Sequence, residues 1–357
     1  MTISNEMLGS AKIKVLGVGG GGCNAITRMY KQRIVGVDYL ALNTDAQSLL
    51  SMDIPDSIRI GEKLTKGQGV GGDPEKGGAS AEESQAEIQS KLIGADMIFI
   101  AAGMGGGTGT GAAPVVAKIA KETTDALVVG VVTKPFEFEG SRRAKVAEEG
   151  IKELRKHCDT LLAIPNERLT VICDEEITTE NAFRMADDVL RIGVQSIAEV
   201  VTTTGEINTD FADVNAIMRN AGPAWMSIGY GAGEDRAKDA VRQALENPLL
   251  DIPINGAKGV LFNIVGGTDL KLDELKIAAD EINKLADPDV NMIFGMGTDE
   301  KMDSEIRVTI IATGFETNDS YIDMDDTSDE IFQIIDEERK YAPVDLPPFL
   351  RRYVQNI

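Results

Sequence analysis

The sequence predicts an α/β protein with four parts: a parallel, Rossmann-like sheet, a long central helix, a second and smaller α/β domain, and a flexible acidic tail. Apolar runs of strand length alternate with helical patterns through the first half, which is typical of parallel strands joined by crossover helices. Apolar residues then recur every three or four positions over residues 179–201, the pattern of a helix with a buried stripe. Residues 316–338 contain ten acids and no lysine or arginine, which indicates a solvated segment.

The first half is expected to alternate strands with helices. We predict strands at residues 12–18, 37–43, 57–60, 96–102, 126–132 and 160–164. We predict helices from the glycine turn at 20–25 to about Tyr30, at 81–92, after Gly111, and at 141–156. Pro114 would lie near the first turn of the third of these helices, where proline is tolerated.

The second half starts with the central helix, which is expected to bury a stripe of apolar side chains. These are Phe183, Ala186, Leu190, Val194, Ile197 and Val201. Further strands are predicted at 260–265, 290–295 and 306–313, and further helices at 234–245 and 272–285. The predicted boundaries are an N-terminal extension at 1–10, a first domain at 11–177, the central helix at 178–204, a second domain at 205–315, a linker at 316–343 and a C-terminal peptide at 344–357.

The composition argues against several classes of function. A net charge of −22 does not fit a nucleic-acid-binding protein, which needs a basic surface. The sequence has no apolar run of 18 residues and no signal-peptide pattern, so neither membrane insertion nor export is predicted. Cys23, Cys158 and Cys173 are odd in number and far apart, and the chain has one histidine, which predicts reduced thiols and no zinc site.

The most informative segment is 103–111, where eight of nine residues are six glycines and two threonines, between an expected buried strand and a helix. Glycine lets the backbone approach a ligand closely and point several N–H groups at it, and a helix N-terminus adds partial positive charge. This combination predicts a site for the phosphates of a nucleotide. A merely flexible glycine loop is the alternative, but such linkers rarely separate a buried strand from a helix.

Two other phosphate motifs fit less well. No Gly-Lys-Ser/Thr follows the run, so it is not a Walker A loop. A second cluster at 17–24 does match the Gly-x-Gly-x-x-Gly pattern of a dinucleotide fold. However, the acid expected at the end of the second strand is missing, because Asp38 lies at the start of that strand. A dehydrogenase would also lack the second glycine loop at Gly103.

The run at 103–111 resembles the phosphate-binding signature of the tubulin/FtsZ superfamily of GTPases, in its bacterial FtsZ form. Other segments resemble the same family in order and spacing: 17–24, 43–47, 67–74, 133–140 and 164–168. The resemblance covers residues 11–314 nearly continuously, together with the C-terminal peptide. It implies a GTP-binding domain at 11–177, a C-terminal activation domain at 205–315, and GTP or GDP as the ligand.

The resemblance also implies roles for individual residues. The phosphate side of the site would be formed by Gly20, Gly21, Gly22, Cys23, Gly71, Gly72, Gly105, Gly106, Gly107, Thr108 and Gly109. Glu139 would accept hydrogen bonds from the ribose hydroxyls, Arg143 would lie beside the sugar and phosphates, and Asn166 would add a contact. Phe183 would stack on the purine, while Asp187 and Asn24 would read the guanine edge.

Elementary chemistry supports the assignments of Asp187 and Phe183. A carboxylate can accept the N1 and N2 donors of guanine, which adenine cannot offer, so adenine would leave a buried acid unpaired. For Phe183 the alternative is a core position on the central helix, and stacking and core packing do not exclude each other.

A second informative segment, 205–214, follows the central helix and is expected at the end of that helix away from the phosphate loops. Asp210 and Asp213 are three residues apart at a helix start and would project to one side. The alternative is that Asn208 or Asp210 is simply a helix N-cap. The segment resembles the synergy loop of FtsZ, which enters the nucleotide pocket of the next subunit.

That resemblance implies that Asn208, Asp210 and Asp213 act in trans and polarise the attacking water. Hydrolysis would then require a head-to-tail polymer, since such a contact does not close on itself. A Mg²⁺ ion bridging the phosphate oxygens is also implied, with no metal ligand expected from protein side chains.

The C-terminal peptide has an apolar core flanked by an acid and two arginines, beyond the acidic linker. This pattern indicates a tethered docking peptide, and a random hydrophobic end is the alternative. It resembles the peptide of FtsZ that docks on membrane-tethering division proteins such as FtsA, ZipA or SepF. The residues expected to make this contact are Asp345, Leu346, Pro347, Pro348, Phe349, Leu350, Arg351 and Arg352.

The resemblance therefore implies a GTP-hydrolysing filament protein that assembles the division ring, in the cytoplasm at mid-cell. A tubulin-like cytoskeletal filament for DNA segregation or cell shape is the alternative; it would share the GTP loops, whereas the peptide at 345–352 favours division. A GTP sensor without hydrolysis is a third hypothesis, which Asp210 and Asp213 argue against.

Overall fold

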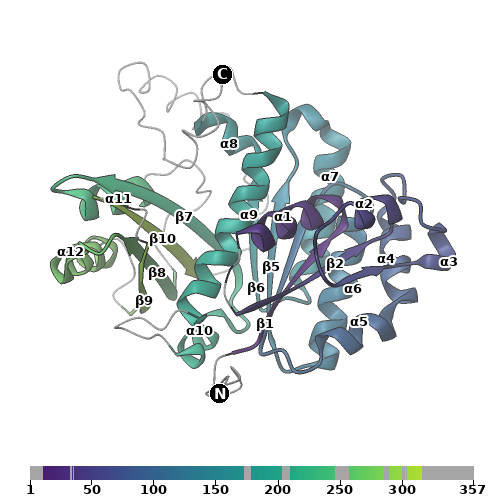
Figure 1. Cartoon of the computed structure of the whole chain (residues 1–357), viewed down its shortest axis with the longest axis horizontal. Helices are drawn as coiled ribbons and strands as arrows, with labels where there is room; N and C mark the ends of the chain where they lie inside the picture. The colour runs from purple at the N-terminus through teal and green to yellow at the C-terminus, as the bar shows by residue number, and fades with distance from the viewer. Residues whose placement is uncertain are drawn as a thin grey trace, which may run out of the picture.

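The computed structural model describes residues 11–32, 34, 36–172, 178–202, 210–245, 257–284, 289–299, 302 and 304–315. The protein is a layered α/β structure in which helices cover both faces of a twisted sheet (Figure 1). The predicted α/β class, the long central helix and the smaller second α/β part are confirmed. The predicted acidic linker and C-terminal peptide lie outside the described residues.

The first half is built on parallel strands whose residues are mostly buried. These are β1 (Ile13–Val18), β2 (Val37–Asn43), β3 (Ser57–Arg59), β4 (Met97–Gly103), β5 (Leu127–Lys134) and β6 (Thr160–Pro165). They lie in the order β3-β2-β1-β4-β5-β6, so the direction of winding reverses between β1 and β4. Doubly wound sheets bind their ligands at this switch point, outside the carboxyl ends of the strands. Both predicted glycine loops follow these two strands.

The helices of the first half are α1 (Gly19–Lys31), α2 (Ala46–Leu50), α3 (Glu62–Thr65), α4 (Pro74–Glu83), α5 (Gln85–Leu92), α6 (Thr108–Thr123), the 3₁₀ turn η1 (Glu137–Glu139), α7 (Ser141–Arg155) and α8 (Glu167–Ile172). Helices α2, α3 and α8 were not predicted, and two of the predicted helices have other bounds. The single helix predicted at 81–92 is instead the end of α4 followed by α5, with a break at Ser84. The helix predicted after Gly111 begins at Thr108, so Pro114 lies inside it and not in its first turn.

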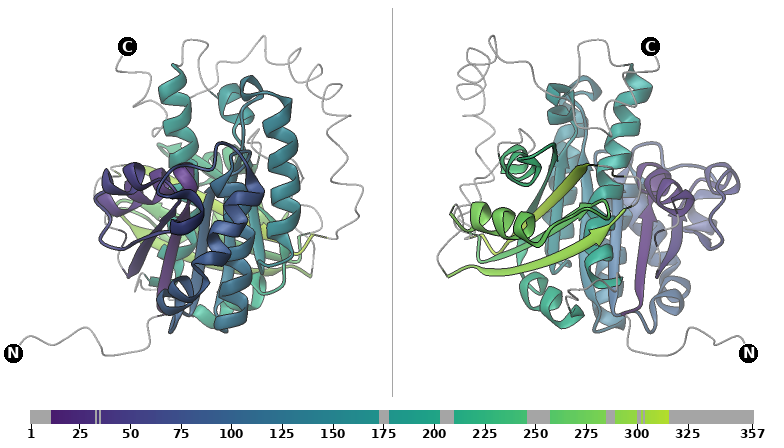
Figure 2. Two further views of the ribbon diagram at one scale, coloured as in Figure 1. Left: turned by 90° about the vertical axis from the view of Figure 1, so that its right-hand side faces the viewer. Right: turned by 60° about the vertical axis from the view of Figure 1, so that its left-hand side comes forward.

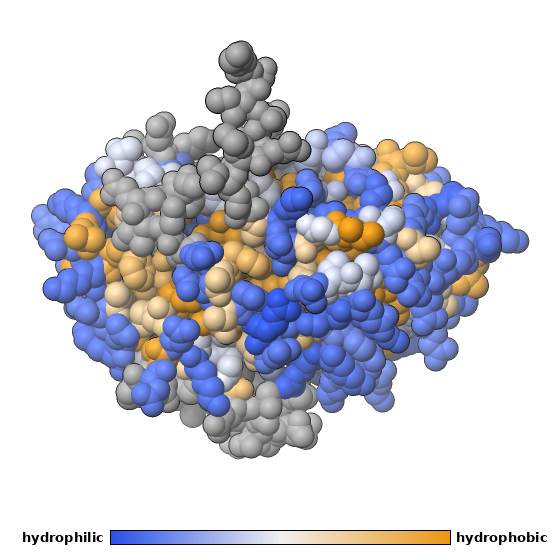
Figure 3. Space-filling view, turned by 90° about the horizontal axis from the view of Figure 1, so that it is seen from below, coloured by the Kyte–Doolittle hydropathy of each residue, from blue (hydrophilic) through white to orange (hydrophobic). Residues whose placement is uncertain are grey.

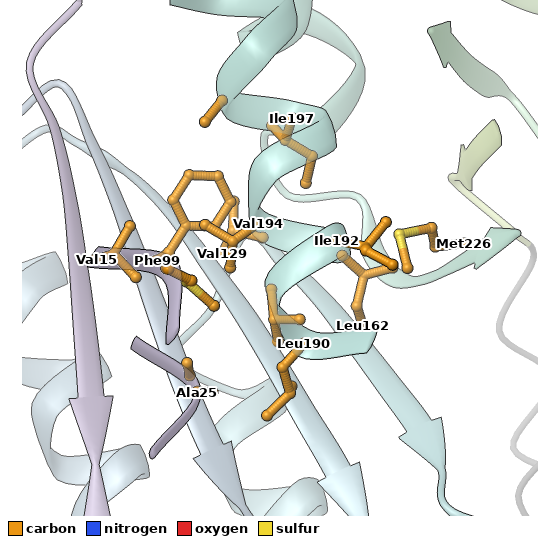
Figure 4. Packing of buried hydrophobic residues seen from close by; sticks show 14 of the residues in the cluster. Val15, Ala25, Phe99, Val129, Leu162, Leu190, Ile192, Val194, Ile197 and Met226 are labelled. Atoms are coloured by element: carbon orange, nitrogen blue, oxygen red, sulfur yellow. The ribbon is translucent and has the colours of Figure 1, made fainter. Parts of the chain in front are cut away.

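The central helix α9 (Thr179–Thr202) runs between the parallel strands and the second half of the molecule (Figure 2). Leu190, Val194 and Ile197 are buried as predicted, and they pack with Phe99 and Val129 of the sheet (Figure 4). Phe183, predicted in the same buried stripe, is 41% exposed. Of the predicted stripe, the residues from Ala186 to Ile197 are therefore buried, while Val201 at its far end is half-buried.

The second half adds helices and four more strands to the same sheet. These elements are α10 (Phe211–Met218), β7 (Gly222–Ala232), α11 (Arg236–Leu245), β8 (Gly259–Gly266), α12 (Leu272–Asn283), β9 (Asn291–Thr298) and β10 (Glu305–Thr313). The sheet continues as β6-β7-β10-β8-β9, where β10 is antiparallel to both β7 and β8. Strand β7 was not predicted. Among the described helices, none is both long and apolar enough to cross a membrane.

Candidate nucleotide-binding site

The carboxyl ends of β1 and β4 each lead into a glycine loop, and the two loops touch. Gly19 has a φ of +70°, and a Cβ placed there would lie 2.6 Å from the backbone nitrogen of Gly109. A Cβ on Gly22 would lie 2.0 Å from the carbonyl oxygen of Ala101 in β4. Only glycine fits this approach, which brings the N-termini of α1 and α6 together. Their partial positive charges make the place between them suitable for an anion.

Other glycines of these loops face open space. A Cβ on Gly20 or Gly106 would have no heavy atom of the described residues within 4 Å. Gly20 and Gly21 are exposed and Gly106 is half-buried, whereas Gly105, Gly107 and Gly109 are buried. The loops thus combine a tightly packed base with an open, backbone-lined surface, which is the form needed to hold phosphates.

The segment before α4 closes on the same place. A Cβ on Gly107 would lie 2.4 Å from Cγ2 of Val70 and 2.8 Å from the backbone nitrogen of Asp73. Asp73 caps α4 by accepting hydrogen bonds from the backbone of Glu75 and Lys76. Gly71 and Gly72 have φ values of 64° and 81° and face open space among the described residues. All three predicted glycine segments are therefore brought together.

Two threonines of the signature run fix its shape. The Thr110 hydroxyl accepts a hydrogen bond from the backbone N–H of Gly105 at 2.8 Å, and this contact is buried. The Thr108 hydroxyl lies 2.9 Å from the hydroxyl of Thr44, at the end of β2. The Thr110 contact thus fixes the loop against the start of α6, and the Thr108 contact fixes that helix start against the end of β2. Together they hold the backbone N–H groups of the loop in place.

Cys23, which is predicted on the phosphate side of the site, turns its side chain into the core. Its side chain is buried in the core and its Sγ donates to the carbonyl oxygen of Gly17 at 3.2 Å, and more weakly to that of Leu42. Burial raises the pKa of this thiol to about 12. Cys23 can therefore offer a ligand only its backbone, while the neighbouring Asn24 is exposed.

Glu139 and Arg143 lie on the β5 side of the loops. The Glu139 carboxylate accepts a hydrogen bond from the backbone N–H of Phe136 at 3.0 Å and forms an ion pair with Arg143. The backbone of Arg143 packs on Gly105, where a Cβ would lie 3.0 Å from the Arg143 carbonyl oxygen. This contact joins the predicted ribose side of the site to its phosphate side.

Asn166 follows β6 and is buried, with 4% of its surface exposed. Its side-chain oxygen is buried and makes no hydrogen bond with any described residue. A buried acceptor without a partner is costly in a folded protein, unless a ligand or water supplies the donor. Asn166 is thus free to take the ligand contact predicted for it.

Phe183 belongs to an aromatic group and not to the core. Its ring meets Phe136 edge-on at 5.4 Å between centroids and Phe138 at 6.1 Å, and these two rings stack on each other at 5.0 Å. Phe136 is buried, whereas Phe138 and Phe183 are exposed. Exposed aromatic rings fixed by a buried one offer a surface on which a purine can stack. The core alternative for Phe183 is wrong.

Asp187 lies one turn further along α9 and is mostly buried. Its carboxylate pairs with the guanidinium of Arg28 in α1, with 3.1 Å between Nε and Oδ2. Burial raises the pKa of this carboxyl to about 6, although Arg28 acts in the opposite direction. Asn24, the other residue predicted to read the base, lies one helical turn before Arg28.

The predicted catalytic acids lie far from this site. Asp210 caps α10 by accepting a hydrogen bond from the backbone N–H of Ala212, and Asp213 lies in the first turn of the helix. Both are exposed. Asp210 is thus an N-cap, as one alternative predicted, but its carboxylate stays accessible. Asn208 and the docking residues at 345–352 lie outside the described residues.

The comparisons with known proteins agree with this geometry. The sequence matches the Tubulin/FtsZ family, GTPase domain, over residues 12–174, and the FtsZ family, C-terminal domain, over residues 222–316. The chain belongs to the FtsZ family. It is therefore a GTP-binding protein and a GTPase, of a cell-division family whose members assemble into filaments.

Solved structures of FtsZ resemble this chain over most of its length. An empty FtsZ dimer from M. jannaschii is 45% identical with a TM-score of 0.83, covering 86% of this chain and 89% of that chain. A point mutant of FtsZ from the same organism gives the same identity and TM-score, covering 86% and 92%. CetZ2 from Haloferax volcanii, in a GTPγS-bound protofilament, shares the fold with a TM-score of 0.71 at 22% identity, covering 90% and 99%.

Sequence reasoning missed several residues of the candidate site. Arg28, Phe136 and Phe138 were not predicted, although each contacts a predicted residue. A signal for Arg28 was present, because it lies four residues after Asn24 and so on the same helix face. Nothing in the sequence pattern connects it to Asp187, which is 159 residues away.

Proposed function

We propose that this FtsZ-family GTPase forms the division ring at mid-cell in the cytoplasm, as a head-to-tail filament that hydrolyses GTP at its subunit interfaces. The observation that carries this proposal is the separation of the predicted acids from the nucleotide loops. Phe183 and Asp187 lie near the start of α9, and α10 follows its other end. The 24 residues of α9 span about 36 Å at 1.5 Å per residue.

Contacts of α10 support this separation independently of its sequence position. The Thr160 hydroxyl, at the start of β6, donates to the carbonyl oxygen of Met218 in α10 at 2.5 Å. Arg219 donates to the carbonyl oxygens of Asp125 and Ala126, just before β5. Helix α10 thus packs at the amino ends of the parallel strands, whereas the nucleotide loops lie at their carboxyl ends (Figure 1). One subunit cannot bring its own Asp210 to its own pocket.

A second copy of the chain can bring Asp210 to a nucleotide pocket. Stacking subunits along α9 would set Asp210 and Asp213 of one copy over the glycine loops of the next. Seen from the amino ends of the parallel strands, apolar residues gather in the middle of the molecule and towards the side of the antiparallel strands (Figure 3). Exposed apolar area of this kind favours association. The contact is heterologous, and it therefore continues into a filament.

The proposal includes a Mg²⁺ ion held by the nucleotide and not by protein side chains. No group of three or more His, Cys, Asp or Glu side chains able to hold a metal occurs among the described residues. Mg²⁺ would be bound through the phosphate oxygens of GTP, where it would neutralise developing charge. The chain's own contribution is the backbone cradle of Gly20 and Gly106, and the acids that would polarise water from the next subunit.

The C-terminal peptide supports the division role over the alternative, a cytoskeletal filament for DNA segregation or cell shape. Its apolar core, between Asp345 and Arg352, would dock on a membrane-tethering division protein of the FtsA, ZipA or SepF kind. The proposal includes no nucleic-acid partner and no direct insertion into the membrane.

Two measurements test the proposal. The GTP turnover per molecule should be near zero at low protein concentration and rise steeply above a critical concentration. A rate per molecule that does not depend on concentration would mean that the monomer carries its own catalyst. A fluorescent fusion should localise to the septum, and exclusive localisation elsewhere would favour the cytoskeletal alternative.

A further inference from the structure

Helix α10 is too short to set its own orientation. It has eight residues, and isolated helices of this length are not stable in water. Val214, Ile217 and Met218 are buried on one side, while Asp210 and Asp213 are exposed at the opposite end from Met218. The direction in which the two acids point is therefore determined by how the rest of the helix is held.

Arg219, the residue that directly follows the helix, makes several of the polar contacts that hold it. The hydroxyls of Thr160 and Thr313 hold the last turn as well, by donating to the carbonyl oxygens of Met218 and Ile217. The Arg219 guanidinium donates from Nε to the Asn215 side chain at 3.0 Å, which folds the arginine back along the helix. Its terminal nitrogens donate to the carbonyl oxygens of Asp125 at 2.9 Å and Ala126 at 3.4 Å. One side chain thus joins α10 to the segment that leads into β5.

A buried carboxylate lies behind this contact. The Asp159 side chain is fully buried and accepts hydrogen bonds from Lys121 at 2.9 and 3.0 Å, from the backbone N–H of Val128 at 2.9 Å, and from that of Asn220 at 3.3 Å. A terminal nitrogen of Arg219 lies 4.0 Å from the same carboxylate.

The chain leaves α10 through Asn220, which has a left-handed φ of 54°. The next contact is the hydrogen bond from the Gly222 N–H to the Asp159 carbonyl oxygen, at 2.8 Å. Asp159 thus anchors the turn that follows the helix, and Arg219 ties the helix itself to the same anchor.

We propose that Arg219 is a positioning residue for GTP hydrolysis in trans, which fixes the direction of Asp210 and Asp213 from the other end of α10. This inference rests on the proposed function, because the acids matter only if they meet the pocket of another subunit. A displacement of about 1 Å at a reacting group can lower a rate about a hundredfold. Loosening α10 should therefore lower turnover without touching the subunit's own nucleotide site.

The test uses the full chain with Arg219→Met. Methionine replaces the aliphatic part of the arginine side chain with an unbranched apolar one and removes the guanidinium. Arg219→Lys keeps the charge and a donor, and Arg242→Met, on the exposed side of α11, is the matched control. GTP binding, filament assembly by light scattering, thermal unfolding and turnover above the critical concentration are measured for each. We expect Arg219→Met to bind GTP and assemble as the wild type does, with turnover reduced about tenfold or more. Arg219→Lys should recover part of the rate, and Arg242→Met should match the wild type.

A mixing experiment separates positioning from general damage. Gly106→Ala places a methyl group where a phosphate would lie, but its α10 is intact. Mixed with Arg219→Met, it should restore turnover, since an intact α10 then meets an intact pocket at some interfaces. Wild-type turnover in Arg219→Met filaments, or a loss of turnover that mixing does not relieve, would overturn this role.

Two further outcomes keep the test decisive. If Arg219→Met does not fold, Asn215→Ala removes only the bond that orients the guanidinium and should lower turnover in the same direction, by less. A full rate in folded Asn215→Ala would then overturn the role. A wild-type rate independent of concentration would overturn the trans arrangement and this role together, whereas a concentration-dependent wild type with full-rate Arg219→Met would overturn the role alone.

Discussion

Arg28 and Asp187 form an ion pair between α1 and α9, with 3.1 Å between Nε and Oδ2, at the edge of the candidate site. The Asp187 side chain is 14% exposed and that of Arg28 is 35% exposed, so the acid is the more buried partner. Burial disfavours the charged form of Asp187, and Arg28 partly offsets this effect. Arg28 therefore favours the charged form of Asp187, the residue proposed to read the base. Arg28 lies on α1, the helix whose N-terminus forms one of the phosphate loops.

Replacing Asp187 should change the choice of base. In Asp187→Ala the guanine edge loses its acceptor, and each lost hydrogen bond to a charged group is worth about 1.5–3 kcal/mol. We expect GTP affinity to fall by at least about tenfold while ATP affinity hardly changes. A competition binding assay with both nucleotides measures this, and unchanged guanine selectivity would remove Asp187 from the site.

The pH dependence of the same selectivity has a defined sign. The pKa of Asp187 is raised from its ordinary value to about 6, so the carboxylate is mostly charged at pH 7 and mostly protonated at pH 5. The preference for GTP over ATP should therefore fall as the pH is lowered through 6, approaching tenfold for each further pH unit. Taking the ratio of the two nucleotides cancels the titration of their phosphates. Asp187→Asn should show a flat ratio over the same range, and a sloping ratio in that variant would assign the effect to another group.

Gly106 and Gly107 are adjacent, yet alanine should affect them differently. At Gly107 a methyl group would overlap Val70 and the Asp73 backbone, and overpacking of this kind costs about 1–3 kcal/mol. Gly106→Ala faces open space among the described residues, so thermal unfolding without nucleotide should be unchanged although GTP binding is weakened. Gly107→Ala should lower both the unfolding temperature and the affinity for GTP. Equal unfolding temperatures for the two variants would contradict the packing of the 67–74 segment on this loop.

Asp210 combines two roles that one substitution can separate. Asparagine caps a helix about as well as aspartate, whereas alanine loses about 1 kcal/mol of helix stability. Asp210→Asn should therefore fold, bind GTP and assemble normally, but hydrolyse slowly and give longer-lived filaments, because bound GTP is retained. Asp210→Ala should add a loss of α10 stability, visible in hydrogen exchange of that helix. Wild-type turnover by Asp210→Asn would leave the residue as a cap only.

The parts of the fold that could be predicted from the sequence are those whose pattern of apolar residues is not interrupted. We could predict the strands of the first half and the buried stripe of α9 from Ala186 to Ile197, because burial on a regular element leaves a regular pattern. Strand β7 was missed because Gly229 and Gly231 interrupt its apolar pattern. In the structure, a Cβ at either position would lie 1.8 Å from a carbonyl oxygen of α11, so these glycines serve the packing of that helix.

The start of α4 was missed for a similar reason. Gly77 and Gly78 weaken a helix pattern, yet a Cβ on Gly77 would lie 2.4 Å from the carbonyl oxygen of Gly107. Of the candidate site, the glycine segments could be predicted because their chemistry is local. The pairing of Arg28 with Asp187 and the aromatic group around Phe183 depend on tertiary distance, which a single sequence does not contain.

The join between the two halves of the sheet has a mechanical consequence. Strands β6 and β7 pair only over Thr160–Gly222, Leu161–Pro223 and Leu162–Ala224, and Pro223 has no N–H to donate. The neighbouring pair of β7 and β10 is matched over nine residues. The sheet should therefore resist bending less along this seam than along the β7–β10 pair, and the seam lies between the nucleotide-bearing strands and the antiparallel strands. A filament of such subunits would carry one compliant joint per repeat, so its curvature would be set as much inside each subunit as between subunits.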